Sequence, residues 1–439
     1  MKFRMVSLGC PKNLVDSEYL ANRLAEAGYV LSDEADLVVV NTCAFIADAA
    51  KESIETIIHE GKAGSAGDKK RLVVTGCLVE RYGAQLPELL PEVDLFVGRG
   101  RYGEFEKLVR SKGLFAGENL FTETFPRRVL TQPPSTYLKI QEGCRNRCSY
   151  CTIPSIRGPL ASRRIDEVRA EFEALLARGF KEFTIIGQDI TSFGKDRDGE
   201  NNGDGENNIT GLLRSLLRVE GDYFLRLLYM HPKGLDEELI DLIAREERII
   251  KYFDLPIQHS EDRILSLMRR GYTKRELESL IRKIRDRIPG AVLRTTVIVG
   301  FPGETEEEFT HLCDFLTVWQ FDNLGAFIYS KEEGTPAARM KGHLRKGVKK
   351  ARFQKVMELQ KEISKEKLKS LKGERAKVVV ESEEGTRRTG RILRQAPDVD
   401  GLAFIQGDCE VGQIRDGVIV ETLDYDVIIR LGGSDGTDT

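Results

Sequence analysis

The sequence predicts an α/β protein in three consecutive parts: an open parallel sheet, a partial (β/α)6 barrel and a small all-β barrel. Strand-like and helix-like patterns alternate over residues 1–117 and again from Tyr137 to about residue 330. Such alternation is typical of parallel sheets whose strands are joined by helices. Short strands separated by turns over 374–430 favour a small β-barrel. We expect domains at 1–117, 130–368 and 371–435 in a chain of 439 residues.

Composition favours a cytoplasmic protein. Hydrophobic residues make up 41% and charged residues 31% of the chain, and the net charge is −3. This charge argues weakly against a surface built as a whole for nucleic acid. No apolar run is long enough to span a membrane, and the N-terminus lacks an apolar stretch of signal-peptide length. In a reducing compartment the eight cysteines are expected to serve metal binding or catalysis, not disulfides.

The N-terminal part places a cysteine after each of its first three strands. Strands are predicted at 2–8, 37–40, 72–75 and 95–97, and helices at 13–29, 45–60 and 80–90. Cys10, Cys43 and Cys77, here called the N-terminal trio, are separated by 33 and 34 residues, about one βα unit each. Ligands of open α/β sheets bind outside the carboxyl ends of the strands. Ordinary buried cysteines are the plainer interpretation. Three cysteines that each follow the carboxyl end of a strand favour instead an iron–sulfur cluster with one open iron.

The central part carries polar or glycine-rich loops at one end of its predicted strands. It follows a proline-containing linker at 112–136. The predicted strands are 137–141, 181–187, 223–229, 250–257, 291–299 and 324–329. In a parallel barrel the chemistry lies at the carboxyl-terminal rim. Gln188, His231, His259 and Gly300 lie in the loops after the second to fifth strands, and the two histidines could equally be ordinary loop residues.

One loop of the central part, at 142–155, holds three closely spaced cysteines. Cys144, Cys148 and Cys151, the central trio, follow the first strand of this part with the spacing C-x3-C-x2-C. Three thiolates on one short loop can hold three irons of a four-iron cluster and leave the fourth open. A zinc site would need a fourth ligand nearby, which this stretch lacks. Buried structural cysteines are the alternative, but Arg145 and Arg147 favour a loop near the surface.

The remaining segments have simple interpretations. Residues 195–208 form a polar, low-complexity insertion, which we expect to be a mobile surface loop. Residues 345–371 have helical periodicity and a basic face expected to be solvated. Strands of the C-terminal barrel are predicted at 376–380, 390–393, 403–405 and 417–420.

The central cysteine loop resembles that of radical S-adenosylmethionine enzymes, and nearly the whole chain resembles the methylthiotransferases among them. Besides the cysteines, the stretches that carry this resemblance are 8–13, 153–158, 252–259 and 329–335. They are similar to those of members that modify an aspartate of a ribosomal protein. The tRNA-modifying members usually carry Pro-Arg-Pro-Gly-Thr where this chain has Lys-Glu-Glu-Gly-Thr at 331–335. Ser260 and Glu261 depart from the family, which more often has a small residue and then serine.

The resemblance implies a flavodoxin-like N-terminal cluster domain, a radical core barrel and a C-terminal TRAM domain. It implies methylthiolation of the β-carbon of an aspartate in small-subunit ribosomal protein S twelve, free or in the small ribosomal subunit. S-adenosylmethionine would bind the open iron of a 4Fe-4S cluster on the central trio, and one electron would cleave it to methionine and a hydrogen-abstracting radical. A second 4Fe-4S cluster on the N-terminal trio would carry the sulfur, methylated by a second S-adenosylmethionine. The implied partners are a sulfur donor and an electron donor such as flavodoxin or ferredoxin.

Four further residues are candidates for contacts with S-adenosylmethionine. Tyr150 is placed to pack on the adenine, although a core tyrosine is an equal interpretation. Gln188 and Arg226 are candidates for the amino and carboxylate groups of methionine, and Gly300 for close approach of the backbone to the nucleoside. Two rival functions stay open: a tRNA adenosine methylthiotransferase with the same chemistry, and a two-cluster electron-transfer protein. Electron transfer works best with fully ligated clusters, which two cysteine trios do not provide.

The charge of the C-terminal part favours a basic protein substrate over tRNA. From Lys372 to Thr439 there are nine basic and fourteen acidic residues, a difference of −5. A barrel that grips RNA should carry a basic groove with stacking aromatics, whereas only Phe404 and Tyr425 are aromatic here. An acidic module would attract a Lys- and Arg-rich ribosomal protein. The alternatives are a solvated acidic face with no partner, or a local basic stripe of arginines.

Overall fold

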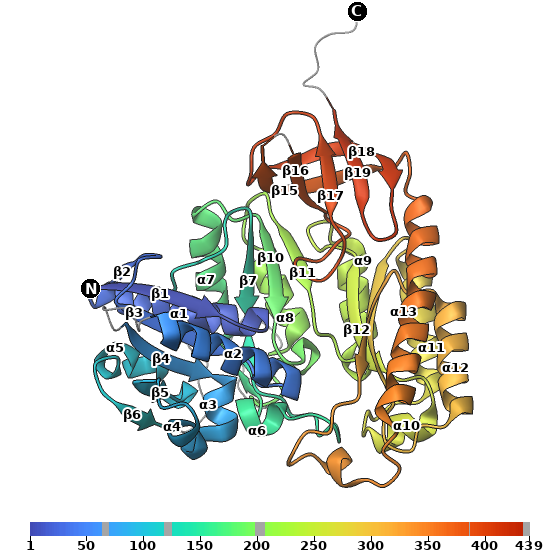
Figure 1. The fold of residues 1–439 in the computed structure, drawn as a ribbon. Coiled ribbons are helices and arrows are strands. Elements are labelled where there is room, and N and C mark those ends of the chain that lie inside the picture. Colours follow the sequence, from blue (N-terminus) through green and yellow to red (C-terminus); the bar gives the residue numbers. More distant parts are fainter. Residues whose placement is uncertain (64–69, 118–124, 198–206, 386, 433–439) are drawn as a thin grey trace, which may run out of the picture.

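The computed structural model describes residues 1–63, 70–117, 125–197, 207–385 and 387–432 and arranges them as three packed parts (Figure 1). An N-terminal sheet lies beside a central set of six parallel strands, and a closed C-terminal barrel lies against one end of that set. The predicted fold class is confirmed. Of the predicted insertion at 195–208, residues 198–206 lie outside the described residues, as do 118–124 of the predicted linker.

The N-terminal part is a six-stranded, all-parallel sheet in the order β2-β1-β3-β4-β5-β6. The strands are β1 Lys2–Ser7, β2 Val30–Leu31, β3 Leu37–Thr42, β4 Arg71–Gly76, β5 Leu95–Val97 and β6 Gly113–Phe115. Leu37 and Val39 enter one apolar core and Val38 and Val40 the other. This alternation buries both faces of β3, so the sheet needs helices on each side.

Helices cover both faces of this sheet. They are α1 Pro11–Glu26, α2 Ala47–Ala63, α3 Cys77–Tyr82, α4 Leu86–Leu89 and α5 Phe105–Leu108. α1 and α5 pack on one face, and α2 and α3 on the other. The helix predicted at 80–90 is broken, because Gly83 ends α3 with a positive φ of 35° and Pro87 starts a new first turn.

The central part holds the six predicted strands as two three-stranded parallel sheets, β11-β10-β7 and β12-β13-β14. The strands are β7 Ser135–Lys139, β10 Glu182–Ile186, β11 Phe224–Leu227, β12 Tyr252–Gln258, β13 Val292–Val299 and β14 Asn323–Ile328. A single bridge between Leu225 and Ile249 joins the halves. The outer helices are α7 Ile165–Ala177, α8 Ile209–Leu217, α9 Glu237–Arg245, α11 Lys274–Arg287 and α12 Glu306–Trp319. One continuous apolar core fills both halves, so they form one partial barrel.

The C-terminal part is a closed five-stranded barrel in the order β15-β16-β17-β19-β18. Its strands are β15 Arg375–Glu384, β16 Arg387–Ile392, β17 Ala403–Gln406, β18 Ile414–Thr422 and β19 Val427–Leu431. The long helix α13 Lys346–Lys369 leads into it, and Val356 of this helix enters the central core. The last strand was not predicted from the sequence.

The C-terminal barrel docks on the amino-terminal ends of the central strands. Arg391 donates hydrogen bonds to Glu182 and Ser135, which are the first residues of β10 and β7. Tyr252, the first residue of β12, donates to Asp400 at 2.7 Å. The carboxyl ends of the same strands therefore lie at the opposite end, away from the C-terminal barrel (Figure 1).

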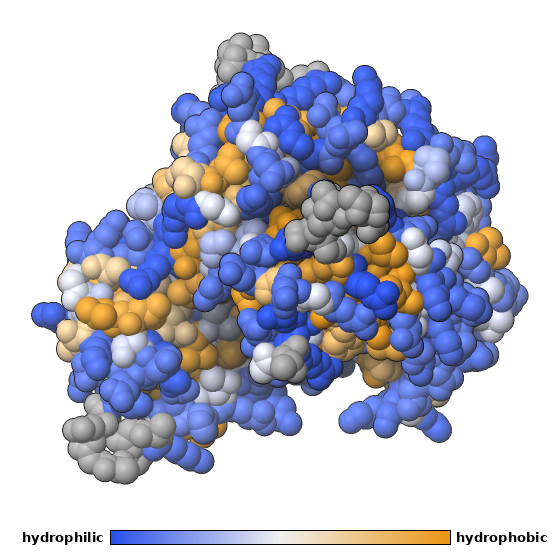
Figure 2. Space-filling view, turned by 90° about the horizontal axis from the view of Figure 1, so that it is seen from above, coloured by the Kyte–Doolittle hydropathy of each residue, from blue (hydrophilic) through white to orange (hydrophobic). Residues whose placement is uncertain are grey.

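The face of the molecule at the C-terminal barrel is mainly hydrophilic. Figure 2 shows the face that carries the C-terminal barrel, where charged and polar side chains predominate and apolar ones gather in separate patches. Leu402, Val418 and Tyr425 are among the exposed apolar residues of this barrel. Among the described helices, none combines the length and the apolar character that crossing a membrane would require.

Candidate functional site

The N-terminal trio lies at the carboxyl ends of three neighbouring strands, as predicted. Cys10, Cys43 and Cys77 follow β1, β3 and β4, which are adjacent in the sheet. The loop after β1 packs directly on Cys43, since a Cβ on Gly9 would lie 2.5 Å from the Cβ of that cysteine. Gly9 has a φ of +86°, so glycine is required there both for conformation and for space.

The environment of this trio combines burial with positive charge. Burial raises the pKa of Cys43 to about 11, and the neighbouring Cys77 and Cys10 add to the rise. Burial also raises the pKa of Cys77, against the opposing effect of Arg157. At Cys10 burial is outweighed by Lys12 and Arg157, which lower the pKa of its thiol. Metal binding would ionise these thiols, and the nearby cations favour that ionised form.

The central trio lies on a loop that begins after β8 Gln141–Glu142 at the carboxyl end of β7. All three cysteine residues are partly exposed. Burial raises the pKa of Cys144 to about 11 and that of Cys151 to about 12. Two donors face the sulfurs: Arg270 donates to Cys148 at 3.3 Å, and the backbone N–H of Ile153 donates to Cys151 at 3.4 Å. Hydrogen bonds to thiolate sulfur are a standard means of tuning iron–sulfur clusters.

Backbone contacts fix the central loop on the rim. The Ser149 hydroxyl donates to the carbonyl of Leu267 at 2.7 Å, and the Ser149 carbonyl accepts from Ala337 at 2.8 Å. Within the described ranges, no three His, Cys, Asp or Glu side chains converge on one metal-ion position. A four-iron cluster needs a wider arrangement, because each thiolate binds a different iron.

Several buried polar atoms at the rim are left without partners. Within the described part of the chain, no hydrogen bond reaches the Gln188 carbonyl oxygen, the His259 Nε2, the Ser260 hydroxyl or the Tyr329 hydroxyl. These groups follow β10, β12 and β14 at the same end of the barrel as the central trio. Buried polar groups are normally paired. Their convergence on one rim fits a polar small molecule beside the central loop.

The structure places three of the four predicted S-adenosylmethionine contacts at the rim. Tyr150 packs against an apolar cluster that includes Met268 and Phe301. The Gln188 amide donates to Glu142, which begins the central loop. Gly300 has a φ of +74° after β13, and a Cβ there would lie 2.5 Å from the Lys349 side chain. Gln188 and Gly300 thus follow β10 and β13 at the same end of the barrel as the central trio.

Arg226 requires a correction. Its side chain reaches towards the opposite end of the barrel, where it donates to Glu182 at 2.9 Å and to the Leu393 carbonyl of the C-terminal barrel at 2.8 Å. It is fully buried there and lies over the Tyr252 ring. Nothing in the sequence pattern indicated that this long side chain would extend to the amino-terminal end of the barrel.

The two rim histidines act as loop residues in this structure. The Nδ1 atoms of His231 and His259 accept hydrogen bonds from the backbone N–H groups of Lys233 and Glu261. Burial lowers the pKa of each imidazole to about 3, so both are neutral at physiological pH. This agrees with the simpler of the two interpretations of the sequence, except that the Nε2 atom of His259 remains available.

The N-terminal and central trios lie on loops that touch across the domain interface. The Thr152 hydroxyl, next to Cys151, donates to the carbonyl of Phe45, two residues after Cys43, at 2.9 Å. Lys12 lies 3.3 Å from the centre of the Tyr229 ring, at the carboxyl end of β11. The carboxyl edges of the N-terminal sheet and the partial barrel therefore face each other.

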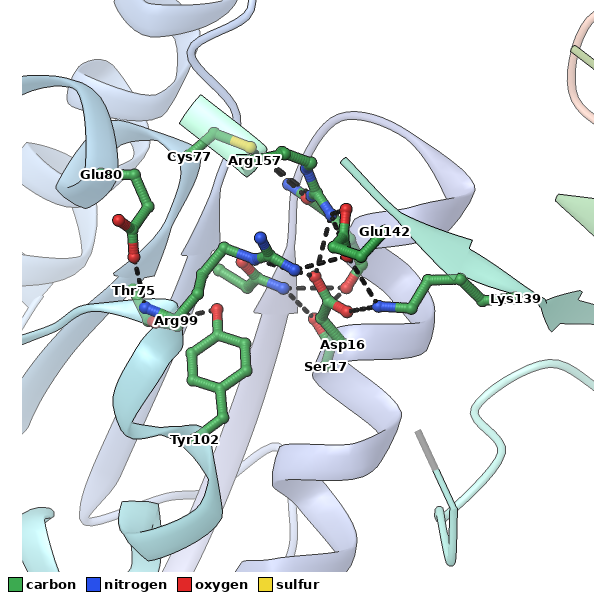
Figure 3. A network of polar contacts seen from close by, with 12 residues as sticks. Asp16, Ser17, Thr75, Cys77, Glu80, Arg99, Tyr102, Lys139, Glu142 and Arg157 are labelled. Atoms are coloured by element: carbon green, nitrogen blue, oxygen red, sulfur yellow. Dashed lines mark hydrogen bonds and ion pairs between the residues drawn. The ribbon is translucent and has the colours of Figure 1, made fainter. Parts of the chain in front are cut away.

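A buried network of charged side chains occupies this interface. Figure 3 shows the carboxylates of Asp16 and Glu142 surrounded by Arg99, Lys139 and Arg157. Burial alone would raise the pKa of Glu142, but the three cations hold it well below its usual range. Sequence reasoning missed this network. The one available signal was that Glu142 and Arg157 flank the cysteine loop.

A second buried ion pair joins the N-terminal and central parts of the chain, close to the end of β14. Glu332 accepts from Arg81 of α3 at 2.7 Å and from the backbone N–H of Ala47, at the start of α2, at 3.0 Å. Glu332 belongs to the 331–335 stretch that distinguishes the two branches of methylthiotransferases. Its side chain is 4% exposed.

Comparison with known proteins gives matches for all three parts. Residues 2–98 match the model described as Uncharacterized protein family UPF0004, residues 138–316 the Radical SAM superfamily, and residues 373–431 the TRAM domain. Curated relatives cover nearly the whole chain. A protein named ribosomal protein uS12 methylthiotransferase RimO from Syntrophotalea carbinolica is 43% identical, covering 97% of this chain and 96% of its own. The protein of that name from Pelotomaculum thermopropionicum is 44% identical, covering 92% and 93%.

Among solved structures, the chain is similar to a radical S-adenosylmethionine methyltransferase, TsrM, from Kitasatospora setae. That structure contains cobalamin and a 4Fe-4S cluster. The TM-score is 0.56 at 18% identity, with 76% of each chain covered. At this identity the likeness shows the shared fold alone.

Proposed function

The chain belongs to the family of ribosomal protein uS12 methylthiotransferases of the RimO type, and on this premise we propose that it methylthiolates the β-carbon of an aspartate in uS12. It is a radical S-adenosylmethionine enzyme with iron–sulfur clusters. The observation that carries the proposal is the meeting of two cysteine trios on facing edges of two sheets. One trio alone would serve radical generation, whereas insertion of sulfur needs a second centre close by.

The six cysteines are the proposed cluster ligands. The central trio would hold a 4Fe-4S cluster that, with S-adenosylmethionine, would supply hydrogen-abstracting radical chemistry, and the N-terminal trio would hold a second cluster that would supply the methylthio group. The chain's own residues position and enclose these groups. Arg270 and the N–H of Ile153 orient two sulfurs of the central trio. Tyr150 offers a ring for the adenine, and Gln188 and Gly300 offer polar and backbone contacts at the rim.

The position of the C-terminal barrel limits its part in the reaction. It contacts the first residues of β7, β10 and β12, so roughly one strand length, about 17 Å for five residues, separates it from the rim. The acidic barrel can therefore attract a basic ribosomal protein through its field, but it does not line the reacting centre. We propose this long-range attraction as its role toward uS12, free or within the small subunit.

The remaining assignments are also proposals. A sulfur donor and an electron donor such as flavodoxin or ferredoxin are needed, because the reaction consumes sulfur and electrons. The cytoplasm is the proposed location, since small ribosomal subunits work there. The domain boundaries 1–117, 130–368 and 371–435 are supported by the three family matches, each of which falls within one of these ranges.

The test is mass spectrometry of the products. Reduced, cluster-loaded enzyme is incubated with S-adenosylmethionine, sulfide and either uS12 or tRNA. We expect a methylthio mass gain on one aspartate of uS12 and none on tRNA. A gain on adenosine of tRNA with unmodified uS12 would assign the chain to the tRNA-modifying branch, which the curated relatives do not favour.

A further inference from the structure

Arg157 connects the two cysteine trios physically. It ends α6 Ile153–Arg157, a short helix that begins two residues after Cys151 in the central loop. Its guanidinium crosses the domain interface and donates to the sulfur of Cys77 at 3.5 Å (Figure 3). It also donates to the side-chain oxygen of Asn13, three residues after Cys10. An arginine of the barrel thus belongs to the surroundings of the N-terminal trio.

The Arg157 side chain is held in this position by two carboxylates. Its Nη1 donates to both oxygens of Glu142 at 3.0 Å and to Asp16 at 3.3 Å. Asn13 is itself fixed, because its amide donates to the carbonyls of Leu8 and Thr42 at the ends of β1 and β3. The guanidinium therefore has one orientation, with its Nη2 aimed at the N-terminal trio.

The charges of the network do not cancel. Arg99, Lys139 and Arg157 are three cations, and Asp16 and Glu142 are two carboxylates; all five side chains are at most 2% exposed. The difference is one positive charge. Lys12, 8% exposed beside Cys10, is a further cation, and its charge acts on both Cys10 and the buried carboxyl of Asp254. Glu80 lies at the edge of the network, where it accepts from the backbone N–H of Arg99, and burial raises the pKa of its carboxyl.

A buried surplus of positive charge is costly unless an anion lies beside it. Neutral thiols do not supply that anion. Three thiolates bound to a four-iron cluster do, since the complex of a 2+ core with three thiolates is anionic. Net charge and hydrogen bonds to sulfur are two of the factors that set the reduction potential of such clusters. The network is therefore matched to an occupied N-terminal trio.

We propose that Arg157 is a positioning residue for the N-terminal cluster, holding the Cys77 thiolate and setting the cluster's reduction potential from the neighbouring domain. This inference rests on the proposed function, because it assumes a cluster on the N-terminal trio. It goes beyond that function in two ways. It assigns part of the second cluster's surroundings to the barrel, and it couples the two centres through a single five-residue helix.

The experiment uses the full-length chain with the central trio replaced by alanine, so that only the N-terminal cluster gives a signal. Its potential is measured by electron paramagnetic resonance during redox titration, beside the iron content. Arg157→Gln removes a positive charge and should shift the reduction equilibrium more than tenfold towards the oxidised cluster, that is, by more than about 59 mV to more negative potential. Arg157→Lys keeps the charge and should stay within tenfold of the parent.

Two further variants separate electrostatics from packing. Asp16→Asn removes a negative charge from the same network and should shift the potential in the opposite, positive direction. Arg163→Gln removes a buried arginine whose guanidinium binds Glu171 and the Lys139 carbonyl and no cysteine, and it should shift the potential much less than Arg157→Gln does. If Arg157→Gln does not fold, the inference is decided by the direction in which Asp16→Asn shifts the reduction potential.

Four results are distinguishable. No iron in the parent with the central trio replaced refutes the two-cluster function itself. Iron with an unchanged potential in Arg157→Gln overturns the role of Arg157. Equal shifts in Arg157→Lys and Arg157→Gln overturn the charge argument, as does a shift of Asp16→Asn to negative potential. Opposite shifts for Arg157→Gln and Asp16→Asn, with little change in Arg157→Lys, support the inference.

Discussion

The buried carboxylate of Glu182 should hold the C-terminal barrel on the base of the central part. Glu182 is fully buried and accepts hydrogen bonds from Arg226 at 2.9 Å, Ser135 at 2.9 Å and Arg391 at 3.0 Å. Glu182→Gln keeps the shape of the side chain and removes its charge. The two arginines, at most 2% exposed, then share no common counter-ion.

Two independent estimates give the loss of folding free energy expected for Glu182→Gln. Removing one partner of a buried ion pair typically costs about 3–5 kcal/mol. Burial would raise the pKa of Glu182 above its ordinary 4.5, but Arg391 and Arg226 outweigh this and lower the pKa to about 2. That difference corresponds to about 3 kcal/mol of folding free energy for a fully buried group. We therefore expect Glu182→Gln to destabilise the chain by about 3–5 kcal/mol at pH 7.

The lowered pKa of Glu182 also determines how its contribution to the free energy of unfolding depends on pH. An acid with a lowered pKa stabilises the fold above its unfolded-state pKa, and the contribution disappears as the pH falls towards the folded-state pKa. The difference between wild type and Glu182→Gln should thus be constant from pH 7 to 5. It should shrink progressively below about pH 4.5, on the way to about pH 2.

The assay is urea unfolding followed by the fluorescence of Trp319, the single tryptophan of the chain. The matched control is Glu381→Gln, which removes the other carboxylate that pairs with Arg391. Glu381 is 36% exposed, so its loss should cost no more than about 1 kcal/mol. A Glu182→Gln variant as stable as wild type, or a Glu381→Gln variant equally damaged, would refute the reasoning.

Three more predictions concern the clusters and the domain interface. Replacing the central trio by alanine should leave about half of the bound iron, as chemical iron analysis will show; complete loss in a folded variant would contradict two independent sites. Replacing the N-terminal trio by alanine should spare cleavage of S-adenosylmethionine but stop methylthiolation, which chromatography and mass spectrometry can separate; wild-type methylthiolation would exclude this trio as the sulfur site. Glu332→Gln should speed hydrogen exchange at the start of α2, where Ala47 donates to Glu332, whereas the exposed neighbour Glu333→Gln should not; equal exchange in both variants would deny the pair a docking role.

The strands and helices that alternate regularly could be predicted from the sequence. Each predicted strand of the central part was found within a few residues, because apolar runs there recur in step with helices. The strands β2, β6, β8, β9 Ala161–Ser162 and β19 were not predicted as separate strands. β2 and β6 have only two and three residues, which is too short for a periodic pattern, and β19 is recognisable mainly through its partners β17 and β18.

The cysteines were predictable for a similar reason, since their spacing repeats with the strands or follows a compact motif. Long charged side chains were not. Arg226 was a candidate contact for S-adenosylmethionine and Arg157 had no predicted role of its own. Arg226 instead binds Glu182 at the base, and Arg157 binds Glu142 and Asp16 at the interface. Asp16 and Arg157 are 141 residues apart, and nothing local in the sequence indicates such a pair.

The docking of the C-terminal barrel has a consequence for how this chain can change over time. Its loop residues Asp398 and Asp400 accept hydrogen bonds from Tyr137 and Tyr252 inside the strands of the central part. Deleting the barrel, or exchanging it for an unrelated module, would leave the two tyrosine hydroxyls without these acceptors and would remove Arg391 from the buried carboxylate of Glu182. We therefore expect the C-terminal barrel and the central part to evolve together. Substitutions can accumulate on the outer surface of the barrel, whereas the loop that holds Asp398 and Asp400 can change only together with the strands it covers.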